Sequence, residues 1–289
     1  MFANLNGIQI AYTDEGEGLP LLFIHGFPLN RRAWAHQVEA FKSRHRVIAL
    51  DLRGFGESGS TSGPVSMSNF AEDVLALLDH LVTGPVILAG HSMGGYIALA
   101  FAKAYPQWLR GLALVGTKAG RDTSEIAKAR RETAEKVRKE GAAVVVDAMA
   151  PKMLSPKNQE EGVAAKVRDL MAPASPQGIV GALLGMAERP DAGGWLGSIR
   201  VPTLVITGAD DSIIPVSESE ALVRSIPEAQ LKVIPKAGHL VAVDQAEAFN
   251  EALKDWLAWG CNDQDRSQPK ARPVEGGVRQ NSFALHQPM

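Results

Sequence analysis

The stretch from Pro85 to Tyr105, PVILAGHSMGGYIALAFAKAY, constrains the fold more than any other part of the sequence. Its first five residues form an unbroken apolar run, which is typical of a strand buried on both faces of a parallel sheet. From Met93 onward, apolar residues recur at helical spacing instead. A buried strand therefore turns directly into a helix between Gly90 and Gly94, and Ser92 lies at the bend.

The segment around this bend has the pattern G-x-S-x-G. A serine on a sharp strand-to-helix turn has its hydroxyl exposed above the sheet, with the helix N-terminus behind it. Side chains at positions 90 and 94 would collide with the adjoining strand and helix, which explains the two glycines. The pattern alone is weak evidence in a chain with 28 glycines, and an ordinary glycine turn is the alternative interpretation. Its place between an apolar strand and an alanine-rich helix favours a nucleophile.

Composition and net charge indicate the kind of protein and the partners that it is expected to bind. The 289 residues are 45% hydrophobic and 21% charged, enough to bury a large core in one domain with an insertion. A net charge of -2 predicts no nucleic-acid or membrane partner, and no apolar run is long enough to span a membrane. The single cysteine, Cys261, cannot form an intramolecular disulfide. Because no signal-peptide pattern opens the chain, we expect a cytoplasmic protein.

Short apolar strands alternate with amphipathic helices along most of the chain. This alternation predicts an α/β fold with a mostly parallel sheet, right-handed crossovers and helices on both faces. An Asn-Gly turn also predicts an N-terminal hairpin. The predicted strands are Phe2–Leu5, Ile8–Thr13, Leu19–Ile24, Arg46–Leu50, Pro85–Ala89, Leu112–Val115, Val201–Thr207 and Leu231–Ile234, and helices are predicted at Asn69–Leu81 and Asp244–Trp259.

Residues 117–200 interrupt the alternation with a helix-rich segment, which we interpret as a helical cap over the carboxyl edge of the sheet. Residues 1–116 and 201–260 then form the core, and the polar residues 261–289 form a flexible tail. The predicted cap helices are Ser124–Glu140, Ala142–Met149, Lys157–Met171 and Ser175–Ala187. Large apolar cap residues either line a substrate pocket or pack the cap's own core: Met149, Met153, Leu170, Met171, Leu183, Leu184, Met186 and Trp195.

A serine hydroxyl is a poor nucleophile unless a base lies within hydrogen-bond reach and a further group orients that base. Of the seven histidines, His239 directly follows a predicted strand and emerges at the same sheet edge as Ser92. The others fall on predicted surfaces, in backbone-shaping turns or in the tail. The orienting acid should also follow a strand, and either Asp210 or Asp211 can serve chemically.

A polar, glycine-rich loop, Asp51-Leu52-Arg53-Gly54-Phe55-Gly56-Glu57-Ser58, follows another predicted strand. It offers no base beside a nucleophile, so we interpret it as a structural loop braced by a contact between Asp51 and Arg53. Asp73, on the next helix, is expected to be solvated or to cap that helix.

Taken together, these motifs resemble those of the α/β-hydrolase superfamily, in its cofactor-independent branch of serine esterases, lactonases, C–C bond hydrolases and haloperoxidase-like perhydrolases. The likeness covers residues 6–259 and rests on five segments in family order: His25-Gly26-Phe27-Pro28, Asp51 to Ser58, Gly90 to Gly94, Gly208 to Pro215 and Gly238-His239. In that family the acid lies three residues after the glycine of the Gly208-like turn. The resemblance therefore implies Asp211 rather than Asp210.

The resemblance implies a catalytic triad in which His239 takes the proton of Ser92, Ser92 attacks an acyl carbonyl, and Asp211 orients the imidazole. The backbone N–H groups of Phe27 and Met93 are implied as the oxyanion hole. No metal or organic cofactor is expected, because the sequence has no clustered set of ligands.

Four functions remain open on the sequence. The first is hydrolysis of a carboxylic ester or lactone of a small, mainly apolar substrate. The second is perhydrolase or haloperoxidase-like activity, since Pro28 resembles that group while Phe27 replaces its common tryptophan. The third is C–C bond hydrolysis of a diketone-type substrate. Outside enzymes, a ligand receptor with slow turnover can share the same fold.

Overall fold

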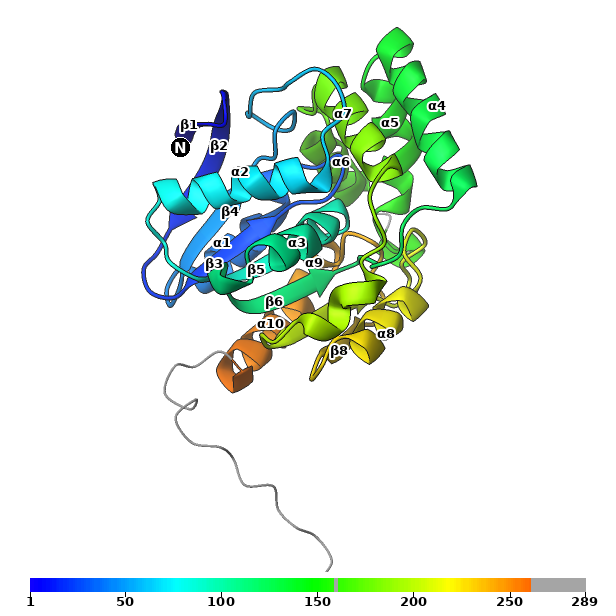
Figure 1. Ribbon diagram of the computed structural model, residues 1–289. Helices are drawn as coiled ribbons and strands as arrows, with labels where there is room; N and C mark the ends of the chain where they lie inside the picture. Colours follow the sequence, from blue (N-terminus) through cyan, green and yellow to red (C-terminus); the bar gives the residue numbers. More distant parts are fainter. Residues whose placement is uncertain (159–160, 261–289) are drawn as a thin grey trace, which may run out of the picture.

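The computed structural model describes residues 1–158 and 161–260. They build an eight-stranded sheet in the order β1-β2-β4-β3-β5-β6-β7-β8 (Figure 1). Strands β3 to β8 run parallel, and the β1-β2 hairpin joins β4 in antiparallel direction. The strands are β1 (Phe2–Leu5), β2 (Ile8–Glu15), β3 (Pro20–Ile24), β4 (Arg46–Leu50), β5 (Val86–His91), β6 (Leu109–Val115), β7 (Thr203–Gly208) and β8 (Gln230–Ile234).

The predicted hairpin and its turn are present. Asn6 and Gly7 both have positive φ angles, 48° and 78°, as a tight two-residue turn between right-twisted strands requires. The five central strands are almost fully buried because helices cover both of their faces, which is why the sequence shows continuous apolar runs there.

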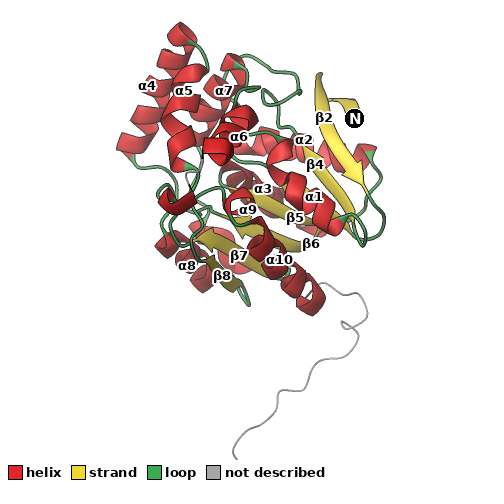
Figure 2. Ribbon diagram, turned by 180° about the vertical axis from the view of Figure 1, so that it is seen from behind, coloured by secondary structure: helices red, strands yellow, loops and turns green. Residues whose placement is uncertain are grey.

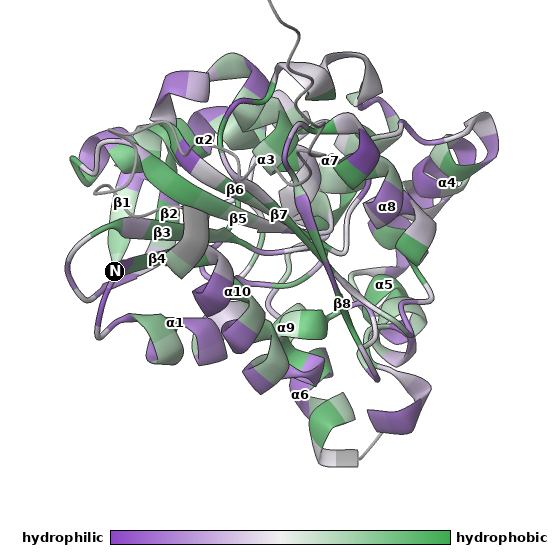
Figure 3. Ribbon diagram, turned by 90° about the horizontal axis from the view of Figure 1, so that it is seen from below, coloured by the Kyte–Doolittle hydropathy of each residue, from purple (hydrophilic) through white to green (hydrophobic). Residues whose placement is uncertain are grey.

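Two helical layers enclose the sheet. The first consists of α2 (Met67–His80), α3 (Met93–Ala104) and α8 (Val216–Ser225), and the second of α1 (Ala35–Phe41), α9 (Val241–Asp244) and α10 (Ala246–Gly260). Figure 2 shows the second layer from behind, and Figure 3 shows the apolar strands between the two layers. Each layer has its own apolar cluster against the sheet. The predicted α/β architecture is confirmed.

Between β6 and β7 the chain leaves the sheet and forms an inserted helical region, as predicted (Figure 1). Within it, α4 and α7 pack along each other. The predicted helix Lys157–Met171 begins at Glu161, because a short 3-10 turn occupies Pro156–Asn158. The inserted helices are α4 (Ser124–Glu140), α5 (Ala143–Met149), α6 (Glu161–Met171) and α7 (Pro176–Ala187). The 3-10 turns within the described residues are Arg31–Trp34, Pro106–Trp108, Ala150–Lys152, Pro156–Asn158 and Gly193–Ser198.

Helix α7 lies directly on backbone of the core. A Cβ atom on Gly178 would lie 2.2 Å from the carbonyl oxygen of Gly54, and one on Gly185 would lie 1.7 Å from that of Val65. A side chain at either position would collide with the backbone of the core, so both helix positions require glycine. The inserted region is thus seated on the loop after β4 and on the segment before α2.

The interpretation of the loop at residues 51–58 is wrong in its contacts. The Asp51 carboxylate is buried and pairs with Arg31, which also reaches Glu57. Arg53 instead pairs with Asp73, at 2.5 and 2.6 Å. Asp73 is fully buried rather than solvated, because α2 turns it inward against the loop. Three ion pairs, two from Arg31 and one from Arg53, therefore brace the loop.

No single helix in the described part of the chain is long and apolar enough to cross a membrane. A pair at Gly162–Met171 and Pro176–Ala187, bent by 86°, passes the length and composition test only when joined. The predicted tail, with Cys261, lies outside the described residues.

Candidate active site

Ser92 occupies the turn between β5 and α3 in a strained conformation, with φ 53° and ψ -113°. Its backbone N–H donates to Val115 at 2.8 Å, and Thr117 Oγ1 donates to its carbonyl at 2.8 Å. A Cβ on Gly90 would lie 2.2 Å from the Gly94 carbonyl oxygen, which confirms the predicted need for glycine. The neighbouring strand β6 therefore holds the turn, and the Ser92 side chain stays partly exposed.

The loop after β3 lies against the start of α3. A Cβ on Gly94 would lie 2.4 Å from the Ile24 carbonyl oxygen, so only glycine permits this approach. Met93 is the first residue of α3, where backbone N–H groups have no partner within the helix. The packing brings the Met93 end of α3 to the loop that carries Phe27, at one edge of the sheet.

His25 fixes the shape of that loop. The Leu52 N–H donates to His25 Nε2 at 3.0 Å, so the proton lies on Nδ1, which donates to the Gly26 carbonyl at 2.9 Å. Burial lowers the pKa of His25, and the ring is neutral as this pattern requires.

Asp211 and His239 form a buried pair at the ends of β7 and β8. The His239 Nδ1–H donates to Asp211 Oδ2 at 2.8 Å, and both side chains are 1% exposed. Asp211 Oδ1 accepts the backbone N–H groups of Ile213 and Ile214 at 2.8 and 2.9 Å. Burial raises the pKa of Asp211, but the hydrogen bond and charge of His239 and these N–H groups outweigh it and leave the pKa below its usual value. The acid is held as a carboxylate.

Asp210 points away from this pair. Its carboxylate accepts the Ser155 hydroxyl at 2.7 Å and lies 3.7 Å from Lys157 Nζ. Of the two aspartates that the residues left open, the structure places Asp211 on His239.

His239 Nε2 is buried and has no hydrogen-bond partner among the described residues. With its proton on Nδ1, His239 presents a free lone pair at Nε2 and can accept a proton there. His91, directly before Ser92, donates from Nε2 to the His239 carbonyl at 2.9 Å. The sequence indicated only a turn role for His91. The signal that could have found this contact was its position beside Ser92, at the edge where His239 emerges.

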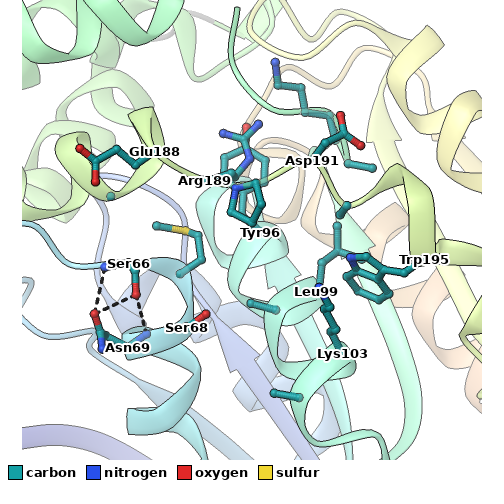
Figure 4. A pocket seen from close by; sticks show the side chains of 18 of the residues that line it. Ser66, Ser68, Asn69, Tyr96, Leu99, Lys103, Glu188, Arg189, Asp191 and Trp195 are labelled. Carbon is teal, nitrogen blue, oxygen red and sulfur yellow. Dashed lines mark hydrogen bonds between the residues drawn. The ribbon is translucent and has the colours of Figure 1, made fainter.

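A pocket of about 600 Å³ lies between α2, α3 and the segment after α7 (Figure 4). Trp195 lines it, and the Arg189 guanidinium lies 3.8 Å above the centre of the Tyr96 ring. None of the predicted triad residues lines this pocket. Four of the eight predicted cap residues are buried members of apolar clusters, which favours the packing interpretation for them: Met153, Met171, Leu183 and Met186. The other four are partly buried against these clusters: Met149, Leu170, Leu184 and Trp195. Within the described residues, no group of three or more His, Cys, Asp or Glu side chains could hold a metal ion.

Both the sequence and the fold of this chain are similar to those of known proteins. The alpha/beta hydrolase fold family matches residues 20–246. This chain belongs to the α/β-hydrolase family. A thermophilic esterase from Thermogutta terrifontis is 42% identical, with a TM-score of 0.86 over 89% of this chain and 97% of that one.

Two sequence relatives have different chemistry. The 3-oxoadipate enol-lactonase 2 of Acinetobacter baylyi is 30% identical to this hydrolase over 86% of this chain and 91% of its own length. A 2-hydroxy-6-oxononadienedioate/2-hydroxy-6-oxononatrienedioate hydrolase of Burkholderia vietnamiensis is 31% identical over 86% of this chain and 91% of its own. The family is thus a hydrolase family whose members act on different bonds.

Proposed function

We propose that this hydrolase cleaves a carboxylic ester or lactone through an acyl-enzyme on Ser92. The buried Asp211–His239 pair carries the proposal, because it leaves Nε2 free at the sheet edge where Ser92 is held on its strained turn. The 42% identity to an esterase and the 30% identity to an enol-lactonase support the same bond class.

In the proposed acylation, His239 Nε2 takes the proton of the Ser92 hydroxyl as the oxygen attacks the acyl carbonyl. The Met93 and Phe27 N–H groups donate to the oxyanion that forms, and the dipole of α3 favours its negative charge. His239 then returns the proton to the leaving alcohol oxygen. Asp211 keeps the proton of neutral His239 on Nδ1 and stabilises the imidazolium.

Deacylation repeats these steps with water. His239 deprotonates the water, the hydroxide attacks the acyl-enzyme carbonyl, and the oxyanion again lies against the same N–H groups. Collapse of the second tetrahedral intermediate expels Ser92, which regains the proton from His239. The carboxylic acid is then released.

The surroundings of the triad support a mainly apolar substrate. Leu29 after β3, Ile213 beside the acid and Leu240 beside His239 belong to one apolar cluster with residues of the inserted region. The inserted region therefore acts as the cap of the proposed site, and we expect it to contact the acyl or alcohol part of the substrate.

The experiment is hydrolysis of p-nitrophenyl esters from acetate to decanoate by the wild type and by Ser92→Ala. Cleavage by the wild type and loss of about 10⁶-fold in kcat for the variant support a serine esterase. Circular dichroism checks that both proteins are folded. A folded wild type that cleaves neither an ester of this series nor a lactone would overturn the proposal.

C–C bond hydrolysis is the second candidate, favoured by the relative at 31% identity that acts on an oxo-dienedioate. Loss of absorbance of a conjugated diketone-type substrate measures it directly. A protein that consumes this substrate faster than any ester belongs to the second class.

A further inference from the structure

Asp244, the last residue of α9, joins the inserted region to the loop that carries His239. Its Oδ2 accepts the backbone N–H of Gly238 at 2.6 Å and that of Ser155 at 2.7 Å. Its Oδ1 accepts the side-chain amide of Asn158 at 2.7 Å. One carboxylate therefore holds three donors, and one of them belongs to the residue directly before the proposed base.

Close backbone packing accompanies these hydrogen bonds. A Cβ on Gly238 would lie 2.4 Å from the Ser155 nitrogen, so the segment at residues 153–158 lies directly on the histidine loop. The Leu240 N–H also donates to the Met153 carbonyl at 2.7 Å. The segment, named here the cap latch, thus holds the loop on both sides of His239.

The cap latch reaches the acid loop as well. Ser155 Oγ donates to Asp210 Oδ2 at 2.7 Å, next to Asp211. The Asn158 amide also lies 3.1 Å from the Lys236 carbonyl oxygen, before the histidine loop. The latch therefore connects both loops whose residues form the buried acid–base pair.

We propose that Asp244 is a positioning residue for His239, and that docking of the cap latch through Asp244 sets the position of the base. Asp244 lies outside the reacting atoms and acts through the backbone at Gly238. Charge-assisted hydrogen bonds fix direction as well as distance, and a catalytic group displaced by about 1 Å can lose about 100-fold in rate. The proposal rests on the proposed function, because it takes His239 as the base.

The test compares Asp244→Ala, Asp244→Asn and Asn158→Ala, with Asp255→Ala as a control. Asp255 is an exposed residue of α10, so its variant makes the same change in charge. Asp244→Ala should lower kcat by about 10- to 100-fold with little change in KM. Asp244→Asn retains an acceptor oxygen for the two backbone N–H groups and should recover part of that loss. Asn158→Ala removes one donor and should give a small loss, and the control should match the wild type.

A second readout is independent of turnover. The His239 Nδ1 proton, held against Asp211, should give a low-field proton resonance in the wild type, assigned by its loss in Asp211→Ala. This resonance should shift or broaden in folded Asp244 variants and stay unchanged in Asp255→Ala. A residue that only stabilises the fold would lower the melting temperature without moving the resonance or kcat.

The two readouts separate the possible failures. If the wild type cleaves no substrate while the resonance moves in the Asp244 variants, the proposed function fails and the positioning role stands. If kcat and the resonance of folded Asp244→Ala match the wild type, the positioning role is overturned. Should Asp244→Ala not fold, unchanged kcat and resonance in both Asp244→Asn and Asn158→Ala would overturn it equally.

Discussion

His91 Nε2 donates a hydrogen bond to the backbone carbonyl of His239 across 2.9 Å, and their ring centres lie 4.8 Å apart. This bond joins the turn that holds Ser92 to the loop that holds the proposed base. Burial, aided by repulsion from His239, lowers the pKa of His91 to about 3. His91 therefore stays neutral beside a ring that must itself become a cation during the proposed reaction.

The neutral state of His91 predicts acid sensitivity. Its pKa is about 3 in the folded protein against an ordinary 6.5, so the unfolded chain takes up the proton first as pH falls. The contribution of neutral His91 to the free energy of unfolding is fully present above about pH 6.5. It falls as the pH is lowered toward 3, by about 1.4 kcal/mol per pH unit for one proton. His91→Gln, which keeps an N–H donor, should make this slope shallower in urea unfolding between pH 7 and 4.

His25 and His45 also have pKa values lowered by burial, so they add loss of the same sign and remain in the variant. The informative quantity is therefore the difference between the two slopes. Equal slopes for the wild type and His91→Gln would show that His91 does not contribute to the acid sensitivity.

The strained turn at Ser92 predicts an unusual order of stabilities. A residue with a Cβ at φ 53° and ψ -113° carries about 1–3 kcal/mol of backbone strain in the folded state. Glycine avoids this strain, but it makes the unfolded chain more flexible and so loses more conformational entropy on folding. Ser92→Gly should exceed Ser92→Ala in free energy of unfolding by about 1 kcal/mol. At Ser225, in the last turn of α8, the same pair of changes should give the opposite order. Urea unfolding of the four variants measures both differences, and the same order at both sites would argue against strain.

The buried contact at His239 predicts different outcomes at the two adjacent aspartates. Asp211→Asn should lower kcat by about 10⁴-fold, because an amide no longer stabilises the imidazolium or fixes the tautomer. Asp210→Asn should stay within about threefold, since Asp210 bonds Ser155 and faces away from His239. Initial ester hydrolysis rates at saturation measure both. A near-normal rate for Asp211→Asn with a large loss for Asp210→Asn would move the acid role to Asp210.

The secondary structure was largely predictable because its signals are local. Helix α4 spans the predicted Ser124–Glu140, with Thr123 accepting the N–H of Ile126 as its cap. The hairpin follows from Asn-Gly alone. The candidates Ser92 and His239 were predicted because parallel strands end at one edge, so residues after β5 and β8 are expected to lie close together there.

What the sequence did not predict depends on contacts between distant segments. From the residues alone Asp210 and Asp211 are chemically alike, and only the resemblance to the family implied Asp211, whose carboxylate lies on His239 in the structure. The proposed role of Asp244 requires the cap latch, 89 residues away from it at Ser155, to lie on the histidine loop. Apolar cap residues likewise have the same sequence signal whether they line a pocket or fill a core.

The misassigned partner of Arg53 gives the last prediction. Arg53 and Asp73 form two hydrogen bonds, the Asp73 carboxylate is fully buried, and Asn6 supplies one further donor at 2.9 Å. Arg53→Met should lower the free energy of unfolding by about 3 kcal/mol, because it leaves a buried carboxylate without its cation. Adding Asp73→Asn should restore part of this loss, since the double variant buries no net charge. Lys128→Met breaks only the exposed pair with Glu132 at 3.9 Å and should cost less than about 0.5 kcal/mol. Urea unfolding of the wild type, Arg53→Met, Asp73→Asn alone and the double variant completes the cycle, and a fully additive loss in the double variant would mean that the two side chains do not stabilise the loop as a pair.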